Sequence, residues 1–148
     1  MRVSTESESS FAWNPFMRHC DDNPPEMLLQ AIDEFNRGDW FDCHESLEEL
    51  WVGEGGETRE FYQGLLQIAV ALYHWRDGNF AGAVRLLEMG VGHLRLVGSL
   101  CQGVDVTDLI AASGRFREEL DSLGPDRMAE LAPRLVPRVR LAKATAAV

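Results

Sequence analysis

The chain has 148 residues, 45% of them hydrophobic and 26% charged, which is the balance of a single globular domain. Its formal net charge is -10, and Lys143 is the one lysine among its 14 basic residues. The acid surplus argues against nucleic acid as the main partner, because phosphate binding requires clustered positive charge. No apolar run reaches the length of a membrane span. We therefore expect neither nucleic acid nor a membrane as a partner.

The N-terminus, residues 1–10, is polar and acidic and lacks the apolar segment of a secretory signal. Cys20, Cys43 and Cys101 are widely spaced and form no paired-cysteine motif, which argues against a disulfide framework or a cysteine-based zinc site. We therefore expect a reduced, cytoplasmic protein. An acid surplus with so little lysine suits a salt-rich cytoplasm, and a genome that replaces lysine by arginine explains it equally well.

Helical periodicity runs through most of the chain, and Gly, Pro and capping residues mark where each helix begins and ends. Pro24-Pro25 opens the first helix and Gly38 ends it. Asp39 and Thr58 can cap the second and third helices, which the glycine loop at residues 53–56 separates. The expected helices are Glu26–Arg37, Trp40–Val52, a third from Thr58 to about Arg76, Phe80–Val97, a fifth from Asp105 or Thr107 to Gly124-Pro125, and a short sixth at Asp126–Leu131.

These elements predict an all-α fold, a compact bundle of five to six helices built from antiparallel helical hairpins. An internal repeat supports the hairpins, since Gly38-Asp39-Trp40 corresponds to Gly78-Asn79-Phe80, and a strand pattern competes only near Val104–Val106. We expect three parts in the chain. They are a partly disordered N-terminal extension (1–24), a helical domain (25–123), and a short helix with a basic tail (124–148).

Two rows of polar side chains are expected on facing sides of the second and third helices. At about 100° per residue, His44, Glu48 and Trp51 share one side of the second helix, inside the stripe that should face the core. The third helix is apolar nearly all round, yet it carries a polar row within about 80° of arc. Because the short glycine loop makes the two helices antiparallel, the rows should meet and satisfy one another. The predicted network comprises His44, Glu48, Arg59, Gln63, Gln67 and His74, covered by Trp51 and Tyr62.

Three interpretations of this network stay open. In the first it is structural, with Arg59 paired to Glu48 and the remaining groups satisfying one another. In the second, a divalent metal ion is the cofactor: His44 and Glu48, at positions i and i+4, reach one ion and His74 is the third ligand, although Arg59 would repel that ion. In the third, Glu48 or His44 is a general base and Arg59 holds an anionic ligand, although no nucleophile or cofactor motif supports catalysis.

The run Phe35-x-x-Gly38-x-Trp40-Phe41-x-x-His44-Glu45-x-Leu47-Glu48-x-x-Trp51 resembles the hallmark of a bacterial and archaeal family known only as domain of unknown function 309. The usual signature of that family is a His, three residues, a Glu, two residues and an aromatic, which are here His44, Glu48 and Trp51. The continuation Arg59-x-Phe61-x-Gln63-Gly64-Leu65-x-Gln67-x-Ala69, then His74 and Gly78-Asn79-x-x-Gly82-Ala83, matches as well. The resemblance covers roughly residues 28–96, and its one departure is Cys43, where a small or apolar residue is expected. It implies a compact all-helical domain, an unproven metal role for the His and the Glu, and no established activity.

The expected function is binding of a divalent metal or a small ligand at a semi-buried pocket between the second and third helices. Whether the pocket also catalyses hydrolysis stays open. Whether the chain is an enzyme stays open, as does self-association. The alternative is a helical-hairpin module for protein interaction, whose polar network is only structural. The two differ in what they require, because an interaction module needs an exposed apolar groove and a ligand site needs a cavity that opens beside Glu48.

Overall fold

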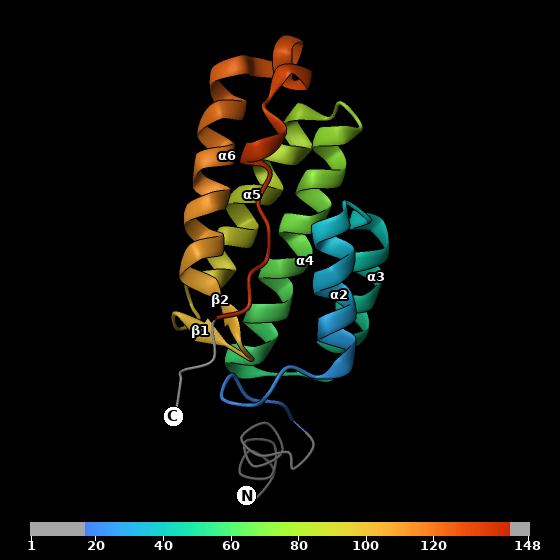
Figure 1. Cartoon of the computed structure of the whole chain (residues 1–148), viewed down its shortest axis with the longest axis vertical. Coiled ribbons are helices and arrows are strands. Elements are labelled where there is room, and N and C mark those ends of the chain that lie inside the picture. Colours follow the sequence, from blue (N-terminus) through green and yellow to red (C-terminus); the bar gives the residue numbers. More distant parts are fainter. Residues whose placement is uncertain (1–16, 143–148) are drawn as a thin grey trace, which may run out of the picture.

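Five α-helices and one small hairpin make up residues 17–142, the part of the chain that the computed structural model describes (Figure 1). The helices pack together and the strands are two residues each, so the predicted all-α bundle is confirmed. The elements are α2 (Glu26–Arg37), α3 (Trp40–Trp51), α4 (Gly56–Arg76), α5 (Phe80–Leu94), β1 (Leu100–Cys101), β2 (Val104–Asp105), α6 (Val106–Arg127) and the 3-10 turns η1 (Met128–Glu130) and η2 (Pro133–Leu135).

Capping residues place several helix ends where the sequence predicts them. Gly38 ends α2 in the left-handed conformation, with a φ of 84°, and its N–H donates to Glu34 and Phe35 carbonyl oxygens. The Asn79 side chain accepts a hydrogen bond from the Gly82 N–H at 2.9 Å and so begins α5. Asp105 caps α6 in the same way. Its carboxylate accepts from the Asp108 N–H at 2.9 Å.

Two predicted caps make other contacts instead. Asp39 precedes α3, but its carboxylate pairs with the Arg37 guanidinium at 3.0 Å and makes no capping hydrogen bond. Thr58 lies inside α4, and its hydroxyl donates to the Arg18 carbonyl oxygen at 2.8 Å. The Asp39 carboxylate and the Thr58 hydroxyl therefore bind partners that sequence spacing alone does not predict.

The predicted break at Gly124-Pro125 is present, and a short helical segment follows it. Gly124 has non-helical backbone angles, with a φ of 73°, so the regular course of α6 is interrupted there. The segment after it reaches Arg127 and continues as the 3-10 turn η1 to Glu130. Glycine permits the positive φ without a steric clash, and proline fits the first turn of a helix. The predicted short helix at residues 126–131 is therefore found as this segment, partly in 3-10 form.

The long helix α4 lies between α3 on one side and α5 on the other, and α6 lies against α5 (Figure 1). Leucine, phenylalanine and tyrosine side chains from every helix fill the core around α4. Two glycines let α4 and α5 approach closely. A Cβ atom on Gly64 would lie 2.9 Å from the Gly90 carbonyl oxygen and 2.6 Å from Leu94 Cδ2, so no larger side chain fits between these helices.

Cys20 and Cys101 form a disulfide bond, which contradicts the expectation of a chain with reduced cysteines. The segment before α2 runs beside the hairpin: the Gln102 backbone N–H donates to the Cys20 carbonyl oxygen at 2.7 Å, and its side chain donates to the His19 carbonyl oxygen at 3.2 Å. A sequence separation of 81 residues hides this pairing from any spacing rule. Cys43 is free and buried. The cytoplasmic location stays a prediction.

The C-terminal segment runs back along the bundle after η2 (Figure 1). The Asn36 side chain holds it through two hydrogen bonds with the Val139 backbone, at 2.8 and 2.9 Å, and Val104 forms a β-bridge with Leu141. Arg140 of this basic tail pairs with Asp108 of α6 at 3.5 Å. Lys143 and the predicted N-terminal extension up to residue 16 lie outside the described residues.

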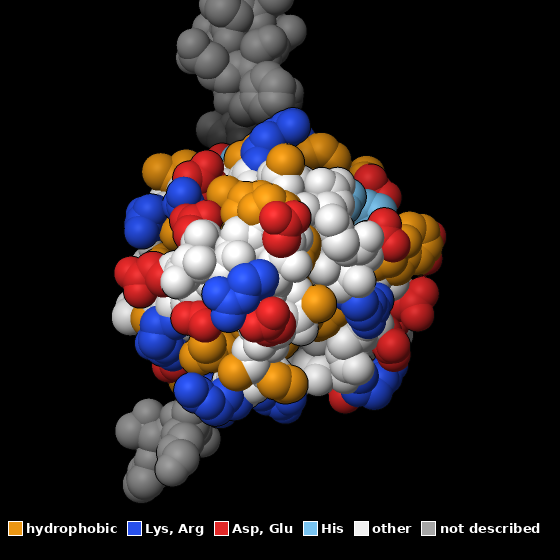
Figure 2. All heavy atoms as spheres, turned by 90° about the horizontal axis from the view of Figure 1, so that it is seen from above, with side chains coloured by type: hydrophobic (Ala, Val, Ile, Leu, Met, Phe, Trp, Pro, Cys, Tyr) orange, Lys and Arg blue, Asp and Glu red, His pale blue; other side chains and the backbone are white. Residues whose placement is uncertain are grey.

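Acidic and basic side chains are intermixed at the end of the molecule that carries the α4–α5 turn (Figure 2). The negative net charge is therefore not gathered into a single patch on that end. Among residues 17–142, no helix is both long and apolar enough to span a membrane.

Candidate functional site

The helix that carries the His-x3-Glu-x2-Trp motif, α3, buries a different face from the one the sequence predicts. Cys43, Leu47 and Leu50 are its most buried side chains, whereas His44 is half-buried and Glu48 is exposed. The buried stripe is therefore centred about 100° from His44 on the helix circumference. The predicted burial of Glu48 is wrong for this reason, and its carboxylate stays hydrated at no desolvation cost.

His44 lies at the edge of the buried stripe, beside the Phe41 ring at a centroid distance of 5.8 Å. Within residues 17–142, its Nδ1 atom is buried and has no hydrogen-bond partner, and the same is true of Trp40 Nε1 and Trp51 Nε1, at the two ends of α3. A buried ring nitrogen without a partner is uncommon in folded proteins and costs free energy. The described part of the chain therefore leaves three ring nitrogens of α3 unsatisfied.

Arg59 reaches α3 from the first turns of α4. Its guanidinium carbon lies 3.9 Å from the Trp51 ring centroid, and its Nη1 donates to the Glu54 carbonyl oxygen at 3.1 Å. A guanidinium over an aromatic face is attracted by the ring quadrupole. The structural interpretation of the network paired Arg59 with Glu48. In the structure the Arg59 guanidinium lies over the Trp51 ring instead.

Three further polar side chains of α4 are displaced from Arg59 around the helix. Glu60, Gln67 and His74 are spaced by seven residues, so they form one line along the helix, about 60–100° from Arg59. Glu60 at the start of that line contacts α5, where its Oε1 lies 2.6 Å from His93 Nδ1. Arg59 over Trp51 is the contact between the two predicted rows that the structure shows.

Each remaining member of the predicted network has its own surroundings. Gln67 is 7% exposed and its Oε1 has no partner, Gln63 is half-buried, and His74 Nδ1 lies 3.3 Å from Asn79 Nδ2. Tyr62 is fully buried and donates to Gln102 Oε1 at 2.8 Å, so it holds the hairpin and does not cover the motif. Burial raises the pKa of Tyr62 to about 12, against the lowering effect of that hydrogen bond.

The predicted metal ligands are not gathered into one group. Within residues 17–142, no three His, Cys, Asp or Glu side chains lie close enough together to hold a metal ion. His74 lies near the end of α4, where its Nδ1 is 3.3 Å from Asn79 Nδ2, whereas His44 and Glu48 are on α3. What remains of the proposed ligand set is the His44–Glu48 pair, one helical turn apart.

Aromatic rings connect α3 and α4 beside this pair. Phe41 is 53% exposed and Tyr73 is 37% exposed, with their ring centroids 6.1 Å apart. Tyr73 in turn lies edge-on to His74. We call the outer side of the two helices the α3–α4 surface. It consists of Phe41, His44, Glu48, Trp51, Arg59 and Tyr73.

Sequence reasoning missed a polar cluster between α2 and α3. Glu34 is 9% exposed, and its carboxylate accepts from the Ser46 hydroxyl at 2.8 Å and from the Gln30 amide at 3.3 Å. Helical spacing could have predicted this cluster. Glu34 follows the inward-facing Ala31 by three residues and Ser46 follows Cys43 by the same spacing, so both lie on buried helix faces. This cluster is a buried polar network that joins the two helices of the first hairpin.

Cys43 adjoins this cluster and is not a nucleophile. Burial, and secondarily the negative charge of Glu34, raise the pKa of the Cys43 thiol well above its ordinary value. The thiolate is the reactive form of cysteine, so a thiol held protonated is inert. Adjacent helix residues also point about 100° apart, so Cys43 and His44 do not form a catalytic pair.

Comparison with known proteins places the motif in a family. Residues 28–86 match the model of the family described as Domain of unknown function (DUF309). The chain is 36% identical over 101 residues to the uncharacterized protein YpuF of Bacillus subtilis (strain 168), covering 67% of this chain and 55% of that protein. It is 38% identical over 55 residues to an uncharacterized protein of Aquifex aeolicus (strain VF5), covering 36% of this chain and 16% of that protein.

The chain thus spans about half the length of YpuF and a smaller share of the Aquifex protein. The matched segment contains α2 from Leu28 onward, all of α3 and α4, and the first half of α5, and therefore the whole α3–α4 surface. The resemblance of the His-x3-Glu-x2-Trp run to this family is confirmed. Through residues 28–86, the chain belongs to the domain of unknown function 309 family.

Proposed function

We propose that this chain is a small helical binding protein whose site is the α3–α4 surface, and that His44 and Glu48 hold a divalent cation there. The observation that carries the proposal is the buried Nδ1 of His44, which has no hydrogen-bond partner among residues 17–142. Glu48 lies one turn further along and is exposed to solvent. An imidazole and a carboxylate at this spacing on one helix can both reach one ion.

The two residues fit a cation by their chemistry, although they are only part of a coordination shell. Imidazole and carboxylate are ligands for Zn²⁺ and similar ions, and water or a bound molecule would supply the remaining ligands. The Arg59 charge is directed over Trp51 and toward the Glu54 carbonyl oxygen, which reduces its conflict with a cation at Glu48. Hydrolysis stays a separate prediction, for which a bound cation supplies water of lowered pKa.

Calorimetric titration of chelator-treated protein with Zn²⁺ tests the proposal. We expect saturable binding by the parent chain, and a loss of at least tenfold in affinity for His44→Ala and for Glu48→Gln. Because Glu48 is exposed, its variant should fold normally, which a melting curve checks. His19→Ala is the matched control, since His19 is also exposed but lies outside the α3–α4 surface. Equal affinities of the parent and both motif variants would reject these ligands.

A second candidate function is protein interaction at the same surface. The exposed ring pair of Phe41 and Tyr73 favours it, because exposed aromatic side chains are enriched where proteins bind one another. The same titration separates the two functions. Absence of Zn²⁺ binding in the parent, together with sedimentation that depends on protein concentration and on Phe41, would favour the interaction function and self-association.

A further inference from the structure

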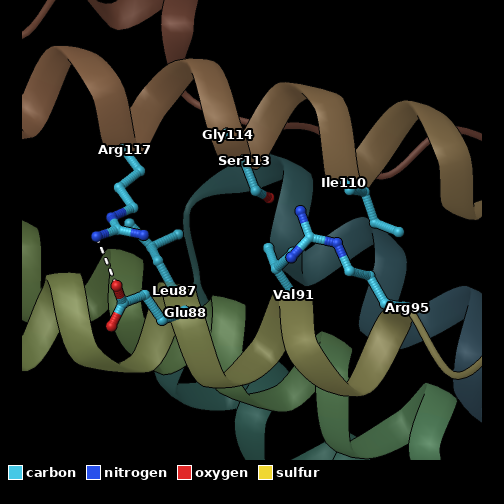
Figure 3. Close-up of a pocket in the computed structure, with 8 residues that line it drawn as sticks. All are labelled: Leu87, Glu88, Val91, Arg95, Ile110, Ser113, Gly114 and Arg117. Atoms are coloured by element: carbon cyan, nitrogen blue, oxygen red, sulfur yellow. Dashed lines mark ion pairs between the residues drawn. The ribbon is translucent and has the colours of Figure 1, made fainter.

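A groove lies between α5 and α6, on the side of the bundle away from α3. Its volume is about 320 Å³, which is within the range of cavities that hold small molecules. Two arginines, a glutamate and a serine reach into it beside three apolar side chains (Figure 3). Apart from the first residues of α5, both helices lie outside the family-matched segment, so the family assigns nothing to this groove.

The two arginines of the groove differ in how their charge is balanced. Arg117 pairs with Glu88 at 2.5 Å and lies 3.4 Å from Asp121, so its charge is largely compensated. Arg95 has no ion-pair partner within residues 17–142. Figure 3 shows its guanidinium rising from α5 toward α6. One uncompensated positive charge therefore stands in the groove of a strongly acidic protein.

Ser113 faces this charge from α6. The residue is 1% exposed, and its buried Oγ has no hydrogen-bond partner in the part of the chain that the structure describes. A serine within a helix can donate to the carbonyl oxygen four residues earlier, but this hydroxyl makes no such bond and points into the groove toward Arg95 (Figure 3). A buried hydroxyl that forgoes its local acceptor is available to a ligand.

We propose that the groove binds a small monocarboxylate with an apolar body. The planar Arg95 guanidinium matches a carboxylate in charge and geometry, and the Ser113 hydroxyl donates a further hydrogen bond. Leu87, Val91 and Ile110 line the rest of the groove and would contact the apolar body. A phosphate dianion fits less well, because Glu88 contributes a negative charge beside Arg117.

NMR titration of the labelled, full-length chain with phenylacetate tests this proposal. Backbone amide signals of α5 and α6 around Arg95 and Ser113 should shift saturably. The neutral analogue phenylacetamide should bind at least tenfold more weakly, because it lacks the charge that Arg95 recognises. Inorganic phosphate should bind more weakly as well. Shifts of equal size with the amide, or a preference for phosphate, would overturn the monocarboxylate assignment.

Two variants weaken the groove and two check the result. Arg95→Gln should lower phenylacetate affinity about tenfold, and Ser113→Ala should lower it by a smaller factor. Arg85→Gln removes an exposed charge of α5 that does not line the groove, and should leave affinity unchanged. Gly114→Met places a side chain at the lining of the groove, where a Cβ meets no atom within 4 Å, and should abolish binding in a folded protein. Unchanged affinity in both Arg95→Gln and Gly114→Met would refute the site.

Discussion

The α3–α4 surface and the α5–α6 groove are opposite kinds of candidate site. The first lies within residues 28–86 and carries the family signature, but among residues 17–142 no three metal-ligand side chains gather there. The second has a hollow of about 320 Å³ into which polar groups converge, but it carries no motif and lies largely outside the matched segment. A shared motif and a shaped cavity are thus independent indications of function, and here they fall on different faces.

The two regions are joined by the close packing of α4 against α5. A substitution that disrupts this packing has the largest expected effect on stability. A Cβ atom on Gly64 would meet Leu94 at 2.6 Å and the Gly90 carbonyl oxygen at 2.9 Å. Gly64→Ala should therefore lower the free energy of unfolding by about 3 kcal/mol, since a backbone atom cannot move aside cheaply. Urea unfolding followed by circular dichroism measures it.

The control is Gly92→Ala in the same helix pair. Gly92 lies within α5, and a Cβ there meets no atom within 4 Å. Alanine should raise stability by about 0.5–1 kcal/mol because it disfavours the unfolded chain. Equal stabilities of the Gly64 and Gly92 variants would mean that α4 and α5 are not held in the close contact described.

A smaller effect separates structural from functional polar groups on α3. Ser46→Ala removes the hydroxyl that donates to the buried Glu34 carboxylate, and should cost about 2 kcal/mol of stability. Glu48→Gln changes an exposed carboxylate and should stay within about 0.5 kcal/mol of the parent. Melting curves of both variants check the contrast. A large loss in Glu48→Gln would restore the idea that the motif itself is the structural network.

The smallest effect concerns Tyr62, which ties α4 to the hairpin before α6. Tyr62→Phe removes one hydrogen bond and should cost about 1 kcal/mol. Because the pKa of Tyr62 is raised from an ordinary 10.0 to about 12, the folded chain keeps a proton that the unfolded chain loses over this pH range. Stability from this source is fully present below pH 10 and declines from there toward pH 12. Melting temperatures should therefore fall less steeply with pH in the variant than in the parent.

Local signals of the sequence predicted the helices well. Gly38, Asn79 and Asp105 mark helix ends in the structure because each acts on its immediate neighbours through a left-handed turn or a side-chain cap. Asp39 and Thr58 carry equally good local signals, yet distant or competing partners hold them. Capping residues thus predict where a helix can end, and long-range contacts decide whether the side chain performs the capping.

The candidate site was harder to predict because it depends on which way each helix is rotated. A rotation of α3 that centres Cys43 and Leu47 moves Glu48 into solvent, and α4 contacts the motif helix through Arg59, which lies over Trp51. The groove and the disulfide bond each form between segments that are distant in sequence, so hydrophobic periodicity does not predict them. Only Glu34 and Ser46 had a readable signal, as polar residues within an apolar stripe.

The bond between Cys20 and Cys101 closes the chain into a covalent ring that contains α2, α3, α4 and α5. The helix α6 and the segment after it lie outside this ring in sequence and form an arm that packs against it. A protease that cuts the exposed loop at Gly53 would therefore leave both pieces of the ring in one molecule until a reductant separates them. The family motif belongs entirely to the ring, whereas the groove exists only where the arm rests on it.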